Sequence, residues 1–141
     1  MSIPTRQALP PEPYLALLGA SICVFNSNNA FIIENILRSG ECDLTWYDLI
    51  DFESGQLKPH IANTITEKSG STAIADLFNE IVSMRNRIIH SFQITAEDGV
   101  QMLATKVKKT NEQFRITEDY LTSFLKENER LCDLLHKHRG Y

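Results

Sequence analysis

The sequence predicts a mostly α-helical protein, a compact bundle of about four to five helices with a small β-hairpin before the last helix. Apolar residues recur at helical spacing over residues 14–37 and 72–92 and again after residue 117. Between residues 96 and 116 this pattern gives way to turn signals and loose alternation, which is typical of a hairpin. The 141 residues, of which 43% are hydrophobic, fit a single domain.

Residues 1–13 are expected to form an extended arm, because they contain four of the five prolines and proline removes amide donors. The helical domain then spans residues 14–141. Its first helix carries an apolar stripe of Leu15, Leu18, Ile22, Phe25, Ile32, Ile33, Ile36 and Leu37. Asn26 and Asn29 lie on that stripe and are expected to kink or split the helix, since asparagine competes for backbone hydrogen bonds.

Residues 41–59 fit either a short helix or a packed loop, and the sequence leaves both open. Pro59 suits the first turn of a helix that runs to Lys68. Ser71 or Thr72 is then positioned to cap the next helix. After the hairpin, Thr117 is expected to cap the last helix, and Gly140 to end it.

The helix expected over residues 72–92 has two faces. Its apolar arc consists of Ile74, Leu77, Phe78, Ile81, Val82, Ile88, Ile89 and Phe92. Its polar arc consists of Asn79, Ser83, Asn86 and His90. Arg85 projects into the apolar arc, where an unpaired charge is costly if buried. It is expected either to pair with an acid such as Glu34 or to be presented to an anionic ligand.

Charge is unevenly distributed along the chain. The net charge is −4, yet residues 84–115 carry six basic and three acidic side chains. Such a basic stretch can attract an anionic ligand even in an acidic protein. The three cysteines form no Cys-x-x-Cys pair and are expected to be reduced and mostly buried. Neither a signal peptide nor a run of about 20 apolar residues is evident, so a cytoplasmic protein without membrane association is expected.

The segment Arg85-Asn86-Arg87-Ile88-Ile89-His90 resembles the Arg-x4–6-His motif of the HEPN superfamily, the higher eukaryotes and prokaryotes nucleotide-binding domain. Members of that family are helical bundles with the motif in the third helix or just after it. Many have a polar residue directly after the arginine, as Asn86 is here. The resemblance covers the motif closely and the order of helices loosely.

The resemblance implies a metal-independent endoribonuclease that acts as a homodimer through the motif helix and needs no cofactor. Its candidate catalytic residues are Arg85 and His90, with Asn86 in support. Histidine titrates near neutral pH and can exchange the proton of a 2′-hydroxyl, whereas arginine holds phosphate with a forked set of donors. The RNA backbone is expected to contact Arg87, Lys106, Lys108, Lys109 and Arg115.

The family also suggests a toxin or defence component with an antitoxin protein as partner. One subgroup has a tyrosine two positions after the histidine, where this chain has Phe92, so control through that hydroxyl is in doubt. Some members bind without cleaving, and the alternative is a non-catalytic dimeric module that binds nucleotides or proteins. A third reading is an unrelated helical interaction protein. Cys132, His136 and His138 suggest a small metal site only weakly, since no fourth ligand is apparent.

Overall fold

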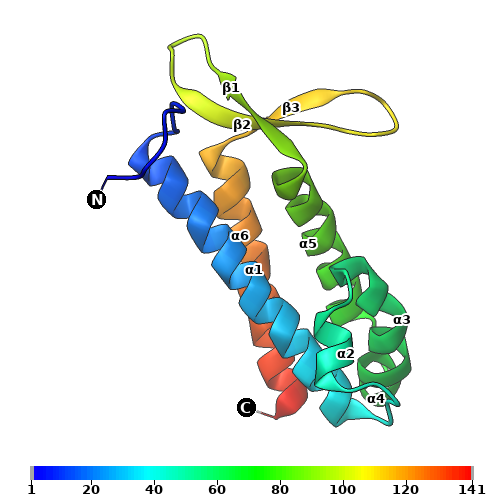
Figure 1. Cartoon of the computed structure of the whole chain (residues 1–141). Coiled ribbons are helices and arrows are strands. Elements are labelled where there is room, and N and C mark those ends of the chain that lie inside the picture. Colours follow the sequence, from blue (N-terminus) through cyan, green and yellow to red (C-terminus); the bar gives the residue numbers. More distant parts are fainter. Residues whose placement is uncertain (1, 141) are drawn as a thin grey trace.

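Three long helices form the body of the protein, whose computed structural model describes residues 2–140. They are α1 (Glu12–Ser39), α5 (Ala73–Ile89) and α6 (Glu118–Arg139). Helices α1 and α6 run side by side in the same direction, and α5 packs against α6 (Figure 1). The predicted class, mostly helical with a small antiparallel sheet, is therefore confirmed.

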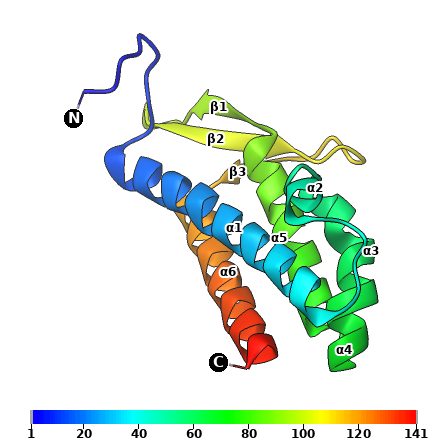
Figure 2. The same ribbon diagram turned by 60° about the horizontal axis from the view of Figure 1, so that its bottom comes forward.

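Short helices connect α1 to α5 and pack near the C-terminal end of α1 (Figure 2). Residues 41–59, which the sequence left open, contain helix α2 (Trp46–Ile50) and the 3₁₀ turn η1 (Ser54–Leu57). Thr45 and Asp48 cap α2 reciprocally, which fixes where it begins. The helix expected from Pro59 to Lys68 is confirmed as one run, α3 (Lys58–Ile61), η2 (Ala62–Thr66) and α4 (Glu67–Ser69), with a π-helical middle.

A three-stranded antiparallel sheet covers one end of the bundle, with strands β1 (Ser91–Thr95), β2 (Gln101–Lys106) and β3 (Gln113–Ile116) in that order. The sequence expected only a hairpin over residues 96–116 and a motif helix reaching residue 92. That helix instead ends at Ile89, because residues 91–95 pair with residues 105–101. Strand formation thus overrides the helical spacing that placed Phe92 on the apolar arc.

Helix α1 departs from expectation at two places. It begins at Glu12 rather than after the arm, with Pro13 in a first turn where no amide donor is needed. It also runs unbroken through Asn26 and Asn29. The side chain of Asn28 donates to the carbonyl oxygen of Asn128 at 2.8 Å on α6, so it stabilises the contact between helices instead of competing with its own backbone.

The core lies between the three long helices and includes the stacked rings of Phe25, Phe78 and Phe124. At the sheet end, the buried hydroxyl of Tyr14 donates to the carbonyl oxygen of Ile116 at 2.6 Å and accepts from the amide of Leu103 at 3.1 Å. These two bonds attach α1 to the sheet. They fix the position of the strands that follow the motif helix.

The structure also tests the expectations about the cysteines and about membrane-spanning segments. The cysteines are free thiols, but the expectation that they are mostly buried is wrong, since Cys23 is exposed and Cys42 and Cys132 are half-buried. Helix α1 is long and apolar enough to cross a membrane by length and composition alone. This corrects the expectation that no segment reaches that threshold, although a helix that packs in a protein core passes the same test.

Candidate functional site

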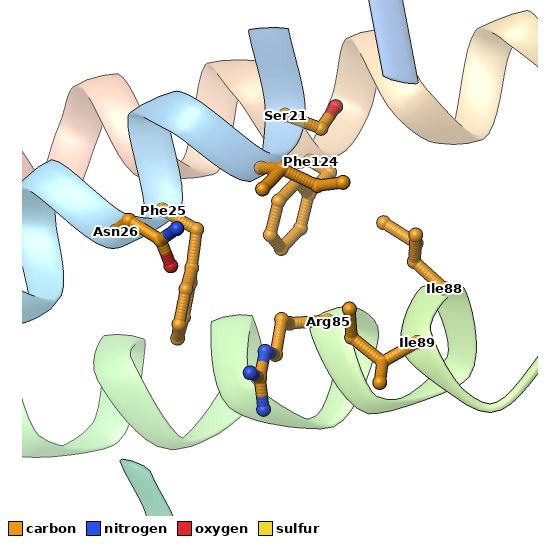
Figure 3. A pocket seen from close by; sticks show the side chains of 8 residues that line it. Ser21, Phe25, Asn26, Arg85, Ile88, Ile89 and Phe124 are labelled. Carbon is orange, nitrogen blue, oxygen red and sulfur yellow. The ribbon is translucent and has the colours of Figure 1, made fainter. Parts of the chain in front are cut away.

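Arg85 lies on α5 with its guanidinium against the core of the bundle. Its central carbon is 5.2 Å from the centroid of the Phe25 ring on α1 (Figure 3). The side chain is half-buried, and no hydrogen bond or ion pair joins it to any other residue of the part described, 2–140. The alternative of a structural pair with Glu34 is wrong, because Glu34 contacts Arg38 and Arg139.

Two hollows meet at Arg85. A pocket of about 100 Å³ lies between α1, α5 and α6, lined by Ser21, Ile22, Phe25, Asn26, Arg85, Ile88, Ile89 and Phe124 (Figure 3). A second hollow of about 350 Å³ continues toward α2 and shares Phe25, Asn26 and Arg85 with the first. Its far wall is formed by residues 50–54, with the carboxylates of Asp51 and Glu53.

The rim of the Arg85 pocket is apolar and exposed. Ile22 on α1 is 43% exposed, and Ile89 on α5 is 47% exposed. Both were expected to be buried on apolar faces of their helices. Exposed isoleucines that line a pocket together with a half-buried cation form a surface that a second protein surface can cover.

His90 is the residue at which α5 ends, with φ −97° and ψ 43°. Its backbone amide donates to the carbonyl oxygen of Asn86 at 2.9 Å, while its carbonyl oxygen is 3.4 Å from the hydroxyl of Thr105. The imidazole is exposed and forms no hydrogen bond with residues 2–140. The helix end and strand β2 therefore hold the backbone of His90 and leave its ring accessible.

A hollow of about 580 Å³ is lined by Asn86, Arg87, His90, Phe92, Lys106 and Lys108. Arg87 donates to the carbonyl oxygen of Lys106 at 2.5 Å, and Lys106 donates to the side chain of Asn111 at 2.7 Å. The ammonium group of Lys108 has no partner among residues 2–140. This hollow, which we call the His90 pocket, thus holds three cations and one histidine.

The structure brings together only some of the residues that the sequence selected. Asn86, Arg87, Lys106 and Lys108 line the His90 pocket, whereas Lys109 lies exposed in the turn before β3 and does not. Arg115, on β3, forms a two-pronged ion pair with Glu97. Arg85 and His90 line different pockets, as expected for two positions about 140° apart around a helix.

Sequence analysis missed one residue of the His90 pocket. Phe92 was counted as apolar helix surface, yet it lies on β1, is 42% exposed and lines the pocket. Residues 91–95, Ser-Phe-Gln-Ile-Thr, alternate polar and apolar, and this period of two is the signal that indicates a strand.

On α6, the hydroxyl of Tyr120 donates to the carbonyl oxygen of Met84 on α5 at 3.0 Å. Burial raises the pKa of Tyr120 to about 12, although the nearby charge of Arg87 acts in the opposite direction. The phenol therefore stays protonated at neutral pH and joins α6 to Met84 of α5.

Two of the residues that weakly suggested a metal site, His136 and His138, make other contacts. The His136 ring packs against Phe31, with centroids 4.8 Å apart, and the His138 ring is 2.6 Å from the hydroxyl of Ser39. Within residues 2–140, no cluster of three or more histidine, cysteine, aspartate or glutamate side chains is arranged to hold a metal ion.

Comparisons with known proteins identified no similar protein. No family model matches the chain, and neither a curated protein nor a solved structure does.

Proposed function

We propose that the chain is a HEPN-like, metal-independent endoribonuclease that acts as a homodimer through the α5 face. One observation carries the proposal. Arg85 is a half-buried guanidinium without an acidic partner among residues 2–140, and it lines a pocket at the motif position. A cation held against apolar groups gains most from an anion that approaches it from outside the chain.

The chemistry divides between two side chains. The 2′-oxygen of the RNA attacks the adjacent phosphorus, and the bond from phosphorus to the 5′-oxygen breaks. His90 takes the proton of the 2′-hydroxyl, and a proton returned to the 5′-oxygen completes the step. Arg85 holds the charge that develops on the phosphate oxygens. The products are a 2′,3′-cyclic phosphate and a free 5′-hydroxyl.

A second copy supplies the geometry that one chain lacks. Arg85 and His90 line separate pockets of the same chain. The exposed isoleucines Ile22 and Ile89 border the Arg85 pocket and favour a second copy on this face. Two copies placed there would gather both arginines and both histidines around one RNA strand. In this arrangement the cations of the two His90 pockets hold the flanking phosphates.

The test is cleavage of labelled single-stranded RNA in excess EDTA, with the 3′ ends of the products analysed. Arg85→Ala and His90→Ala are each expected to lower the rate by about 100-fold or more. Arg130→Ala and His136→Ala are matched controls, since both residues lie on α6 and line neither pocket. The controls are expected to cleave like the parent chain.

Equal loss in a test variant and its matched control would contradict the assigned roles, as would full activity in His90→Ala. Thermal unfolding of each variant separates lost chemistry from lost folding. His90→Ala is expected to unfold at the same temperature as the parent, because its ring is exposed.

The second candidate is an RNA-binding module that does not cleave. It is favoured by the composition of the His90 pocket, where exposed Phe92 lies beside Lys106 and Lys108 and Arg85 is absent. Stacking on an aromatic ring and contact with phosphates need no catalytic arginine. Saturable RNA binding without cleavage across several RNAs would favour this module.

A further inference from the structure

The His90 pocket contains an amide side chain that the fold does not use. Asn86 lies in the last turn of α5, is half-buried and lines the pocket. Two asparagines of the other long helices, Asn35 and Asn128, donate to the carbonyl oxygen four residues earlier, each at 2.9 Å. Asn86 makes no such bond, and its side chain has no hydrogen-bond partner among residues 2–140.

Both polar atoms of this amide are accessible. In the part of the chain that the structure describes, 2–140, one side-chain polar atom is buried without a hydrogen bond, and it belongs to Asn35. The unbonded Oδ1 and Nδ2 of Asn86 therefore have accessible surface. A ligand in the pocket is offered one acceptor and one donor side by side.

An aromatic ring lines the same pocket. Phe92, the second residue of β1, is 42% exposed. Its neighbour across the sheet is Ala104, whose small side chain covers little of the ring. No other aromatic ring of residues 2–140 packs against Phe92. An exposed ring of this kind is a surface on which a base of a single strand can stack.

A free cation completes the pocket. Lys108 follows strand β2, so the dipole of a helix does not explain its position. Its ammonium group has no partner among residues 2–140, and no acidic residue lines the pocket. The ring, the amide and the ammonium group match the face of a base, its edge and a phosphate. A volume of about 580 Å³ lies within the range of ligand sites.

The pattern of donor and acceptor on Asn86 favours one base. Adenine presents an amino donor beside a ring-nitrogen acceptor on both its Watson–Crick and its Hoogsteen edge, and an asparagine amide matches either edge. The Hoogsteen edge of guanine has two acceptors and cannot match in this way. Cytosine and uracil are smaller than a purine and cover less of an aromatic ring. Adenine therefore gains most from Phe92 and Asn86 together.

We propose that the His90 pocket binds an adenine base of single-stranded RNA, stacked on Phe92 and held at its edge by Asn86, with Lys108 on a neighbouring phosphate. This base site rests on the proposed contact of the pocket with RNA. His90 lines the same pocket, so the ribose of the bound adenosine is the one whose 2′-hydroxyl meets the imidazole. Cleavage is therefore expected on the 3′ side of adenine.

Fluorescence anisotropy with 2′-O-methyl oligonucleotides measures binding alone, because the blocked 2′-oxygen cannot attack the phosphate. The probes are labelled oligouridylates that carry adenine, guanine, cytosine or uracil at the central position. The adenine probe is expected to bind about tenfold more tightly than the uracil probe. AMP is expected to bind more weakly than the adenine probe, because it has a single phosphate. Equal affinity for AMP would assign the pocket to a free nucleotide instead.

Asn86→Asp is the sharpest variant. A carboxylate has two acceptors and no donor, so it matches the adjacent N1 and N2 donors of guanine, whereas adenine has a single donor group. The preferred central base is expected to change from adenine to guanine. Asn79→Asp is the matched control, since it adds the same charge to the same polar arc of α5 but does not line the pocket. It is expected to retain the preference for adenine.

Phe92→Leu is expected to weaken binding of the adenine probe about tenfold, because an aliphatic side chain offers no flat face for stacking. Its control is Tyr47→Leu, which removes an exposed ring of α2 that lies outside the pocket. Both rings are exposed, and thermal unfolding of each variant checks that the fold is retained.

Equal affinity for the four probes would overturn the base site. So would a preference for adenine that survives Asn86→Asp, or equal weakening by Phe92→Leu and Tyr47→Leu. Cleavage of RNA without any preference for adenine would contradict the base site and leave the ribonuclease proposal standing. Binding that prefers adenine, without cleavage of unmodified RNA, would support the base site and contradict the ribonuclease proposal.

Discussion

Two arginines in this protein lie over phenylalanine rings of the same helix, and their surroundings differ. Arg85 is 5.2 Å from the centroid of Phe25, and Arg139 is 5.7 Å from that of Phe31. Arg139 also contacts Glu34 at 2.5 Å, whereas Arg85 has no acidic partner among residues 2–140. The same pair of side-chain types thus occurs once with a counter-ion and once without.

The difference separates an arginine that a carboxylate holds from one for which we propose a functional role. Arg139 joins the last turn of α6 to α1 through both its charge and its contact with Phe31. Arg85 joins α5 to α1 through the aromatic contact alone, so its charge remains available to a ligand. A guanidinium attracted to an aromatic face gains about 0.5–2 kcal/mol, which compensates only in part for the loss of water around it.

Substitution of the two phenylalanine rings is expected to have the largest effect on the free energy of unfolding. Phe25 is buried and stacks with Phe78 and Phe124 at centroid distances of 6.3 and 6.2 Å. Phe25→Ala is expected to lower the free energy of unfolding by about 3–5 kcal/mol, because it leaves a cavity in the core. Phe31→Ala removes a half-buried ring and is expected to cost about 1–2 kcal/mol. Urea denaturation measures both, and equal losses would contradict the difference in packing.

Removal of the two guanidinium groups is expected to have a smaller effect on the free energy of unfolding. Arg139→Ala is expected to lower the free energy of unfolding by about 1 kcal/mol, since it removes an ion pair and packed methylene groups. Arg85→Ala is expected to change it by less than about 0.5 kcal/mol, because loss of the contact with Phe25 is offset by relief of the desolvation of the half-buried charge. Chemical denaturation of the two variants side by side measures the contrast. A clearly larger loss in Arg85→Ala would assign a structural role to that arginine.

The Arg85 region was the more predictable of the two from sequence. Helical spacing placed Arg85 on an apolar face, and the structure keeps it there without an acidic partner among residues 2–140. The candidate partner Glu34 was wrong because its partners, Arg38 and Arg139, lie one turn away on α1 and on the distant last helix. Contacts between residues about 100 positions apart leave no periodic signal in a single sequence.

Strand β1 and the contact made by Asn28 could not be predicted from the sequence, for different reasons. Strand β1 follows directly after the motif helix, and its residues continued the apolar spacing far enough to be read as helix. Asn28 was hidden because its effect depends on Asn128, on another helix. Local patterns therefore predicted the helices, whereas tertiary partners decided where α5 ends and which contact Asn28 makes on the unbroken α1.

The smallest effect on stability is expected at a third arginine, Arg115, which the sequence analysis named as a candidate RNA contact. Arg115 pairs with Glu97 on the surface, and this pair lowers the pKa of Glu97 to about 2. Because that pKa is depressed, the stabilisation by the pair is complete at neutral pH and is lost as the pH falls toward about 2. Arg115→Ala is expected to raise the pKa of Glu97 toward its ordinary value of about 4.3, as measured by carboxyl NMR titration, while the backbone hydrogen bond at Glu97 remains. Lys109→Ala, in the neighbouring turn, is the control and should leave it unchanged.

Exposure limits the effect of this pair on stability, since surface ion pairs contribute little to folding. It also bears on the comparison between Arg85 and Arg139. An arginine already held by a carboxylate must exchange that partner before it can hold a phosphate, which favours Arg85 and Lys108 as the cations of the proposed RNA contact. A Glu97 pKa near 4 in the parent chain would show that Arg115 is free in solution. It would then rejoin the cations expected to contact RNA.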